Sequence, residues 1–267
     1  MRLLSDLTGS NGVHRWAGYR YRTQEAQARR YPKNCRVSGI FYSLRKERLV
    51  LDIKTREESA FSKKQYLSLL NESLVAFKEL LDLQYNITVA RKGKKRFLNL
   101  VVFDRNFYHM VGLQHLNDVA LVNEYPNIYR KIATDNLESQ NIKSKLVESK
   151  HFSEIVGRLY ALIYLRDNFY NAKDNKHYKF LSKEYGNYTA IEYDYIIQSE
   201  YKGIIYYYFL RHDEKSNDPN QCVVVSLFTK GIVDFTKGQA YMTLLEKVEF
   251  NKKTNQTKII YKHNAIV

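Results

Sequence analysis

Five segments in the C-terminal part of the chain are rich in β-branched and aromatic residues and are separated by turn-forming residues. They are Thr189–Gln198, Gly203–His212, Gln221–Phe228, Ala240–Phe250 and Thr257–His263. No helical pattern lies between them, and a parallel strand pair would need a long crossover connection. The segments therefore predict consecutive strands of one antiparallel sheet.

The residues before this sheet predict helices. Apolar residues recur every three or four positions within Ser62–Tyr85, which indicates an amphipathic helix with Ser62 as its N-cap. The turn-forming stretch Arg91–Lys95 separates two strand-like runs and predicts a β-hairpin. Further helical stretches are expected at about Asn127–Asn136, Asn141–Ser149 and Ser153–Asp167. We therefore expect an α+β fold in which a helical N-terminal half packs on a C-terminal antiparallel β-sheet.

The positive charge changes in character along the chain. The 267 residues include 43 Lys and Arg against 28 Asp and Glu, a net charge of +15. Residues 1–60 hold 13 basic residues, 10 of them Arg, whereas residues 61–267 hold 30, of which 23 are Lys. This change predicts an Arg-rich N-terminal extension over residues 1–60 and an α+β domain over residues 61–267. The extension is either a nucleic-acid arm that orders on binding or a poorly ordered segment.

Composition excludes several classes of protein. A hydrophobic fraction of 44% is enough for a packed core, and the two cysteines, Cys35 and Cys222, exclude a disulfide scaffold. No apolar run approaches the ~18 residues of a membrane span, so we expect a cytoplasmic protein with no membrane partner. The fingerprints of P-loop, Rossmann, zinc-protease and serine-hydrolase sites are missing. The excess of basic residues instead predicts a polyanionic partner.

Histidine and arginine side chains suit phosphate chemistry without a cofactor. RNA carries its own nucleophile, the 2′-hydroxyl, so an enzyme needs only proton transfer and cations near the phosphate. His109, framed by apolar residues, is predicted to be the acid or base, with a core or capping histidine as the alternative. Arg158, on an apolar helix, is predicted to stabilise the phosphate; alternatively it forms an ion pair with Glu154 four residues earlier. His115 is expected on a helix surface.

Two hydroxyl side chains interrupt apolar strands. Ser226 is expected to share a face with Val224 and Cys222, and Thr243 is a comparable case. Each either positions a substrate or meets a hydrogen-bond partner in the core. Further RNA contacts are predicted for Lys237, Gln239, Tyr206, Tyr208 and Arg211.

Tyrosine is concentrated in the predicted sheet: 14 of the 23 tyrosines lie in residues 151–267. In a strand, Tyr206 and Tyr208 point to one face and Tyr207 to the other. One interpretation is sheet packing, because tyrosine is a good strand former. The other is a platform on which unpaired bases stack, each contributing ~1–3 kcal/mol.

Six short blocks occur in an order that resembles the phage-associated branch of the barnase–EndoU–colicin–RelE-like (BECR) nucleases. The blocks are Phe97–Asp118, Ile155–Leu159, Glu192–Ile197, Tyr206–Leu210, Val224–Phe228 and Gly238–Lys247. The resemblance covers about residues 62–250 and implies a BECR-like RNase fold and metal-independent RNA cleavage in phage, mobile-element or toxin settings. Residue by residue, it nominates His109, Arg158, Ser226 and Thr243 as catalytic.

The sequence thus predicts a metal-independent endoribonuclease that needs no cofactor and cleaves RNA by attack of the 2′-hydroxyl on the adjacent phosphate. RNA and an immunity or antitoxin protein are the expected partners. One alternative is a non-catalytic RNA-binding accessory protein. Another is a metal-dependent nuclease that uses Asp194, Glu200 and Lys202.

Overall fold

The computed structural model describes residues 61–120, 127–181, 189, 191–231 and 233–264, all within one compact unit, Phe61–Val267. The extension predicted over residues 1–60 lies outside the described residues. The helices are α2 (Lys63–Leu81), α3 (Asn106–Met110), η1 (Leu113–His115), α4 (Ile128–Ile132), α5 (Leu137–Val147), α6 (Phe152–Ile163), α7 (Leu165–Tyr170) and η3 (Ala172–Asp174). The strands are β1 (Leu83–Arg91), β2 (Lys94–Val101), β3 (Lys176–Lys179), β4 (Tyr195–Tyr201), β5 (Ile204–His212), β6 (Gln221–Thr229), β7 (Ala240–Asn251) and β8 (Gln256–Lys262).

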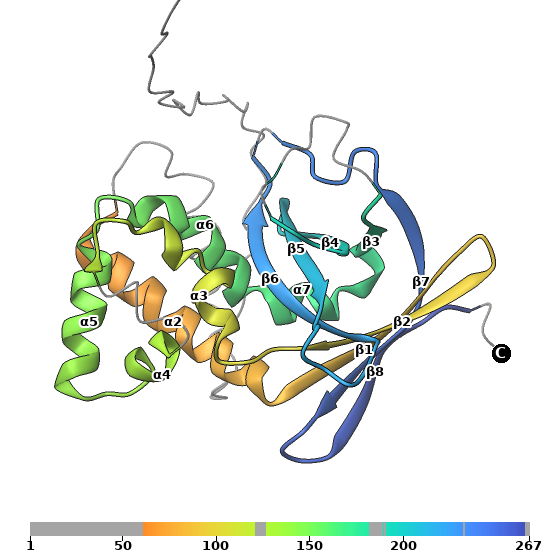
Figure 1. Cartoon of the computed structure of the whole chain (residues 1–267), viewed down its shortest axis with the longest axis horizontal. Helices are drawn as coiled ribbons and strands as arrows, with labels where there is room; N and C mark the ends of the chain where they lie inside the picture. Colours follow the sequence, from red (N-terminus) through yellow and green to blue (C-terminus); the bar gives the residue numbers. More distant parts are fainter. Residues whose placement is uncertain (1–60, 121–126, 182–188, 190, 232, 265–267) are drawn as a thin grey trace, which may run out of the picture. The chain divides into compact units, whose positions relative to one another are not determined.

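Seven of these strands form a closed barrel (Figure 1). Their order around the ring is β1-β2-β6-β5-β4-β3-β7, and a β1–β7 pairing closes it. The pairing of β2 with β6 is parallel and the others are antiparallel, so the barrel is mixed. Strand β8 pairs with β7 outside the ring.

The expected architecture, a helical half on an open antiparallel sheet, is wrong. The N-terminal half supplies β1 and β2 to the barrel wall, and the sheet is mixed and closed. The physical reason is the partner of β6, which pairs with β2 in parallel rather than with the next strand, β7. The segment between them, which holds helices and three strands, provides the long crossover that a parallel pair requires.

Local sequence signals place the first helix and hairpin as expected. The side chain of Ser62 accepts a hydrogen bond from the backbone of Gln65, whose side chain caps the Ser62 backbone in return, so α2 begins with a capping box. The β1–β2 turn consists of Lys92 and Gly93 with φ of 48° and 75°, the backbone that suits a tight hairpin. The predicted helix, its N-cap and the hairpin are confirmed.

Helix α7 lies inside the barrel. The ring of Phe169 has its centroid 5.0 Å from that of Tyr85 on β1 and 5.4 Å from that of Tyr208 on β5. Since β1 and β5 lie on nearly opposite sides of the ring of strands, only an interior side chain reaches both. Asn168 of the same helix also bonds Tyr208 and accepts a hydrogen bond from Ser199 on β4. The barrel is therefore a packed core around a helix.

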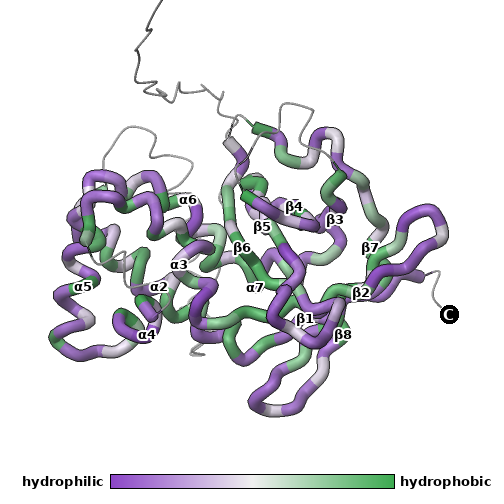
Figure 2. Tube along the Cα trace, in the orientation of Figure 1, coloured by the Kyte–Doolittle hydropathy of each residue, from purple (hydrophilic) through white to green (hydrophobic). Residues whose placement is uncertain are grey.

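This filling explains the tyrosine run. Tyr206, Tyr207 and Tyr208 all have 0% exposure: two face the interior, and Tyr207 packs on the outer face against Phe235. Hydrophobic residues follow the strands and α6 in Figure 2, whereas the hairpin ends are hydrophilic. The structure thus supports sheet packing, and it corrects the hypothesis that Tyr206 and Tyr208 stack on RNA bases, since neither ring is accessible. Within the described ranges, no helix has the length and apolar character to cross a membrane.

Candidate functional site

The guanidinium of Arg158 joins three elements on the outer face of the barrel. Its Nη1 donates to Ser226 Oγ on β6 at 3.0 Å, and its Nη2 donates to His115 Nε2 of η1 at 3.1 Å. Its Cζ lies 4.1 Å from the centroid of the Phe228 ring, a stacking contact. Arg158 itself is only 9% exposed. We call these four residues the Arg158 cluster.

Two glycines make room for this arrangement. A Cβ on Gly157 of α6 would lie 2.8 Å from Thr229 Oγ1, so the missing side chain lets α6 approach β6. A Cβ on Gly112 would lie 2.7 Å from Arg158 Cδ, and the φ of Gly112 is +80°, a conformation that favours glycine. Both glycines therefore hold Arg158 between η1 and β6.

A β-bulge orients Ser226 toward Arg158. In the β5–β6 pairing Phe209 is opposite Ser226 and Leu210 is opposite Val224, so Val225 is the extra residue. The bulge breaks the strict alternation that placed Ser226 on the face of Val224 and Cys222. That part of the prediction is wrong: Ser226 faces outward, with Phe209, while Val224 faces the interior.

The Arg158 cluster contains a cation without a carboxylate partner in the described part of the chain. Burial lowers the pKa of Arg158 to about 10, so the guanidinium remains charged at neutral pH. The predicted ion pair with Glu154 does not form, because Glu154 Oε1 lies 2.8 Å from His151 Nδ1 instead. A buried cation without a counter-charge lowers the stability of the protein, and a bound anion would supply that counter-charge.

His115 is the exposed member of the cluster. Since a guanidinium can only donate, His115 Nε2 accepts and the ring proton resides on Nδ1. Burial, and then the charge of Arg158, lower the pKa of His115, while Glu154 raises it. The neutral imidazole can therefore take up a proton beside a bound anion.

His109 lies on α3, just before η1 in the sequence, but beside a different arginine. Burial and the charge of Arg211 lower its pKa, and its ring centroid is 4.9 Å from that of Tyr108. Arg211 is on the outer face of β5, two residues from Phe209, and its Nη1 lies 3.5 Å from Glu192 Oε2. The structure thus brings together Arg158 with Ser226, and His109 with Arg211.

The other predicted site residues are not brought to Arg158. Thr243 is exposed on β7, on the far side of the ring from β6. Gln239 accepts a hydrogen bond from the Leu181 backbone at 2.8 Å, which gives it a structural role. Lys237 is exposed on the β6–β7 loop, two residues after Phe235, which packs on Phe228.

The carboxylates of the metal-dependent alternative are also apart. Asp194 precedes β4 and accepts a hydrogen bond from the His212 backbone at 2.8 Å, whereas Glu200 lies near the other end of that strand. Six residues of extended strand span about 20 Å. Asp194 and Glu200 therefore cannot bind one cation together, and Lys202 lies beyond Glu200 in the β4–β5 turn.

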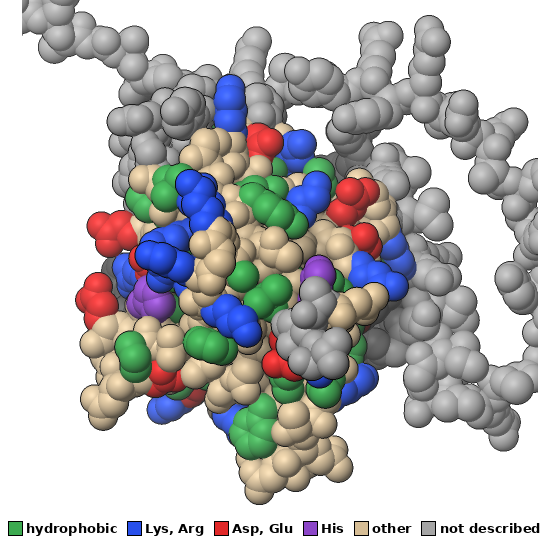
Figure 3. All heavy atoms as spheres, turned by 90° about the vertical axis from the view of Figure 1, so that its right-hand side faces the viewer, with side chains coloured by type: hydrophobic (Ala, Val, Ile, Leu, Met, Phe, Trp, Pro, Cys, Tyr) green, Lys and Arg blue, Asp and Glu red, His purple; other side chains and the backbone are tan. Residues whose placement is uncertain are grey.

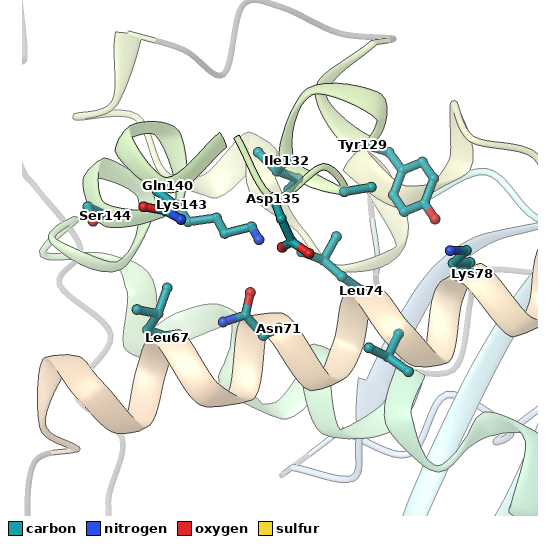
Figure 4. A pocket seen from close by; sticks show the side chains of 12 residues that line it. Leu67, Asn71, Leu74, Lys78, Tyr129, Ile132, Asp135, Gln140, Lys143 and Ser144 are labelled. Atoms are coloured by element: carbon teal, nitrogen blue, oxygen red, sulfur yellow. The ribbon is translucent and has the colours of Figure 1, made fainter. Parts of the chain in front are cut away.

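A groove of about 590 Å³ lies between α2, α4 and α5. Asn71 of α2 points toward Lys143 and Asp135 across it (Figure 4). None of the residues that line it is a predicted site residue, so it is separate from the Arg158 cluster.

Sequence reasoning missed two members of the cluster, His115 and Phe228. His115 was expected to be a plain surface residue, but it follows Gly112 by one short turn and so meets Arg158. The glycine in this stretch was the available signal, because a required glycine marks a close approach of the backbone to another group. Phe228 carried no polar signal at all.

Comparison with known proteins gives the class of this protein. Residues 69–264 match the family model described as phage-Barnase-EndoU-ColicinE5/D-RelE like nuclease4 (PBECR4). The match covers most of the chain, so the chain belongs to this family of phage-associated nucleases. No curated protein and no solved structure shows significant similarity to it.

Proposed function

We propose that the protein is an endoribonuclease that cleaves RNA at the Arg158 cluster without a metal ion. The observation that carries the proposal is the buried, charged guanidinium of Arg158, which has no described carboxylate partner and is bonded to an exposed, neutral His115. In this proposal Arg158 is the cation that binds the phosphate, and His115 is the base that accepts the proton of the 2′-hydroxyl. Membership of a nuclease family supports the same reading.

The proposed reaction uses the nucleophile that RNA contains. A phosphate oxygen accepts from Arg158, which frees Nε2 of His115 to take the proton of the 2′-hydroxyl. The 2′-oxygen then attacks phosphorus and the bond to the 5′-oxygen breaks, leaving a 2′,3′-cyclic phosphate. Water gives the proton to the leaving 5′-oxygen, because the lowered pKa of His109 leaves that imidazole largely neutral, and Ser226 keeps the guanidinium oriented.

Cleavage of RNA in EDTA tests the proposal. The expected products carry 2′,3′-cyclic phosphate ends, and the same oligomer with 2′-deoxy sugars stays intact. His115→Ala should lower the rate by about 10²–10⁴, the usual contribution of a general base, and Arg158→Lys by about 10²–10³. Arg130→Lys is the matched control, because Arg130 is exposed and pairs with Asp104 elsewhere.

Three results would contradict the proposal or its choice of base. Loss of cleavage in EDTA with recovery on adding Mg²⁺ would assign the reaction to a metal-dependent nuclease. Salt-sensitive RNA binding without products would support the non-catalytic accessory protein instead. Equal rates for His115→Ala and the wild type would remove His115 from the mechanism and leave His109 as the base to examine.

We also propose that the nuclease acts in the cytoplasm as a toxin and is restrained by an immunity or antitoxin protein. A ribonuclease active among the RNAs of its own cell requires such restraint. Growth arrest on expression of the wild type, but not of His115→Ala, is the expected outcome. Equal arrest by both would contradict the proposal that RNA cleavage causes toxicity.

A further inference from the structure

A second basic site lies at the end of the barrel where the β1–β2 hairpin meets β3 and β7. It is a pocket of about 240 Å³. Its lining consists of Arg91, Lys92, Lys94, Arg96, Lys179, Leu181 and Met242. We call it the basic pocket. Lys and Arg side chains are spread over the side of the molecule shown in Figure 3, which is the side of the β1–β2 hairpin and the start of β7 in Figure 1.

Strand register directs the hairpin cations inward. Arg91 lies two residues after Val89, which has 0% exposure, and therefore shares its face. Lys94 is the direct partner of Arg91, and Arg96 is the direct partner of Val89. Three cations of the hairpin thus point to the side of the sheet that faces the barrel interior.

The opposite wall contributes a fourth inward cation. Lys179 lies two residues after His177, which is 2% exposed, and pairs with Ala240, which is 2% exposed. These three residues share the interior face. Lys179 therefore faces the hairpin cations across the open end of the barrel.

The arrangement is unfavourable for the protein alone. Arg91 and Lys94 are like charges directly opposite each other on antiparallel strands, a pairing that destabilises a sheet. No acidic residue lines the basic pocket, and neither these two nor Lys179 forms an ion pair with a described residue. Charges held in this way lower their repulsion when an anion lies between them.

We propose that the basic pocket binds a phosphate group in the backbone of a single nucleic-acid strand, apart from the Arg158 cluster. One guanidinium group can donate two parallel hydrogen bonds to two phosphate oxygens, and lysines add positive charge. Leu181, which is exposed, offers apolar surface to the adjoining sugar. At about 30 Å³ per water, the volume holds about eight waters, enough for a hydrated phosphate. The site requires no cleavage, so it goes beyond the proposed ribonuclease.

Binding of a 2′-deoxy single strand tests the site separately from RNA cleavage, because this strand lacks the nucleophile. Affinity of the full chain is measured by fluorescence anisotropy over a salt series. The double variant Arg91→Gln/Lys94→Gln should weaken binding about tenfold and reduce the salt slope by about 0.7, the value for one lost phosphate contact on a single strand. The control Lys145→Gln/Lys253→Gln removes the same charge from α5 and the β7–β8 turn and should bind as the wild type does.

Thermal unfolding of the same proteins shows that the variant folds. Its midpoint should equal or exceed that of the wild type, because one like-charge pair is removed. Equal losses of affinity in variant and control, or no loss in either, would overturn the proposal. Titration of inorganic phosphate forms a second arm: binding of phosphate without binding of the strand would overturn the assignment to a nucleic-acid backbone.

Discussion

Arg158 and Lys247 are two buried cations in opposite situations. Arg158 is on the outer face of the barrel, has two hydrogen bonds, and keeps a pKa of about 10. Lys247 is in the interior with 0% exposure, and its Nζ has no hydrogen-bond partner among the described residues and lies 4.7 Å from the Phe169 ring centroid. Burial lowers its pKa to about 7.

The difference shows how the protein accommodates two kinds of buried basic side chain. A guanidinium cannot lose its proton at neutral pH, so a buried one requires hydrogen-bond acceptors. Arg158 has two neutral acceptors and no described carboxylate, so its charge is not neutralised. An ammonium can enter the core because it loses its proton. His177, which lies near Lys247 and has its pKa lowered well below the usual value, shows the same preference of the interior for neutral groups.

The largest expected effect is on the pH dependence of stability, tested by Lys247→Met. The pKa of Lys247 falls from 10.5 in the unfolded chain to about 7 in the folded one. Between these values the unfolded chain binds more protons, so stability rises with pH, by about 4–5 kcal/mol in total at 1.36 kcal/mol per pH unit. Lys247→Met should abolish this rise and stabilise the protein at pH 7, as measured by urea unfolding at pH 7 and pH 10.

Lys253→Met, at an exposed turn position, provides the control for that experiment and should keep the wild-type pH dependence. If Lys247→Met retained the rise, another group would be responsible for it. The comparison between the two buried cations would then lose its basis.

Gly112→Ala should produce the next largest effect. An alanine here would have to adopt a φ of +80°, and its Cβ would lie 2.7 Å from Arg158 Cδ. We therefore expect the free energy of unfolding to fall by about 3 kcal/mol and the nuclease activity to decrease. Gly93→Ala separates the two causes, because Gly93 has a φ of +75° but nothing within 4 Å of the added Cβ. It should cost only about 1 kcal/mol. Equal costs would show that the contact with Arg158 is unimportant.

Ser226→Ala should have the smallest effect of the three. It leaves Nη1 of Arg158 without its acceptor, and an unpaired buried donor on a charged group costs about 2 kcal/mol. Ser199→Ala is the comparison with a hydrogen bond between uncharged groups, because Ser199 donates to Asn168 at 3.2 Å in the interior. It should lower the free energy of unfolding by about 1 kcal/mol. Thermal unfolding measures both, and a larger loss for Ser199→Ala would reverse the expected order.

Local signals predicted local structure well, whereas the closure of the barrel lies beyond them. The N-cap at Ser62 and the tight β1–β2 turn depend on a few neighbouring residues. The β2–β6 and β1–β7 pairs join residues more than a hundred positions apart, and no pattern within either strand names its partner.

The candidate site divides in the same way. Arg158 and Ser226 were found because a polar residue interrupts an apolar pattern, and the structure joins them by a hydrogen bond. The partnership of His115 depends on the fold of a loop, and the direction of Ser226 depends on a bulge opposite Phe209. Thr243 looked equivalent to Ser226 in sequence, but it lies on another wall of the barrel.

The β1–β7 pair, in which Leu83 is opposite Asn251, closes the barrel with one of its last strands. The order of translation therefore affects when the barrel and the proposed site can form. A nascent chain that has emerged only as far as the end of β5 contains Arg158 but neither Ser226 nor Phe228. Because contacts between distant residues form slowly, we expect the ring to close late in folding. The proposed nuclease site is therefore assembled only after nearly all of the barrel has been synthesised, and RNA close to the ribosome meets an unfinished site.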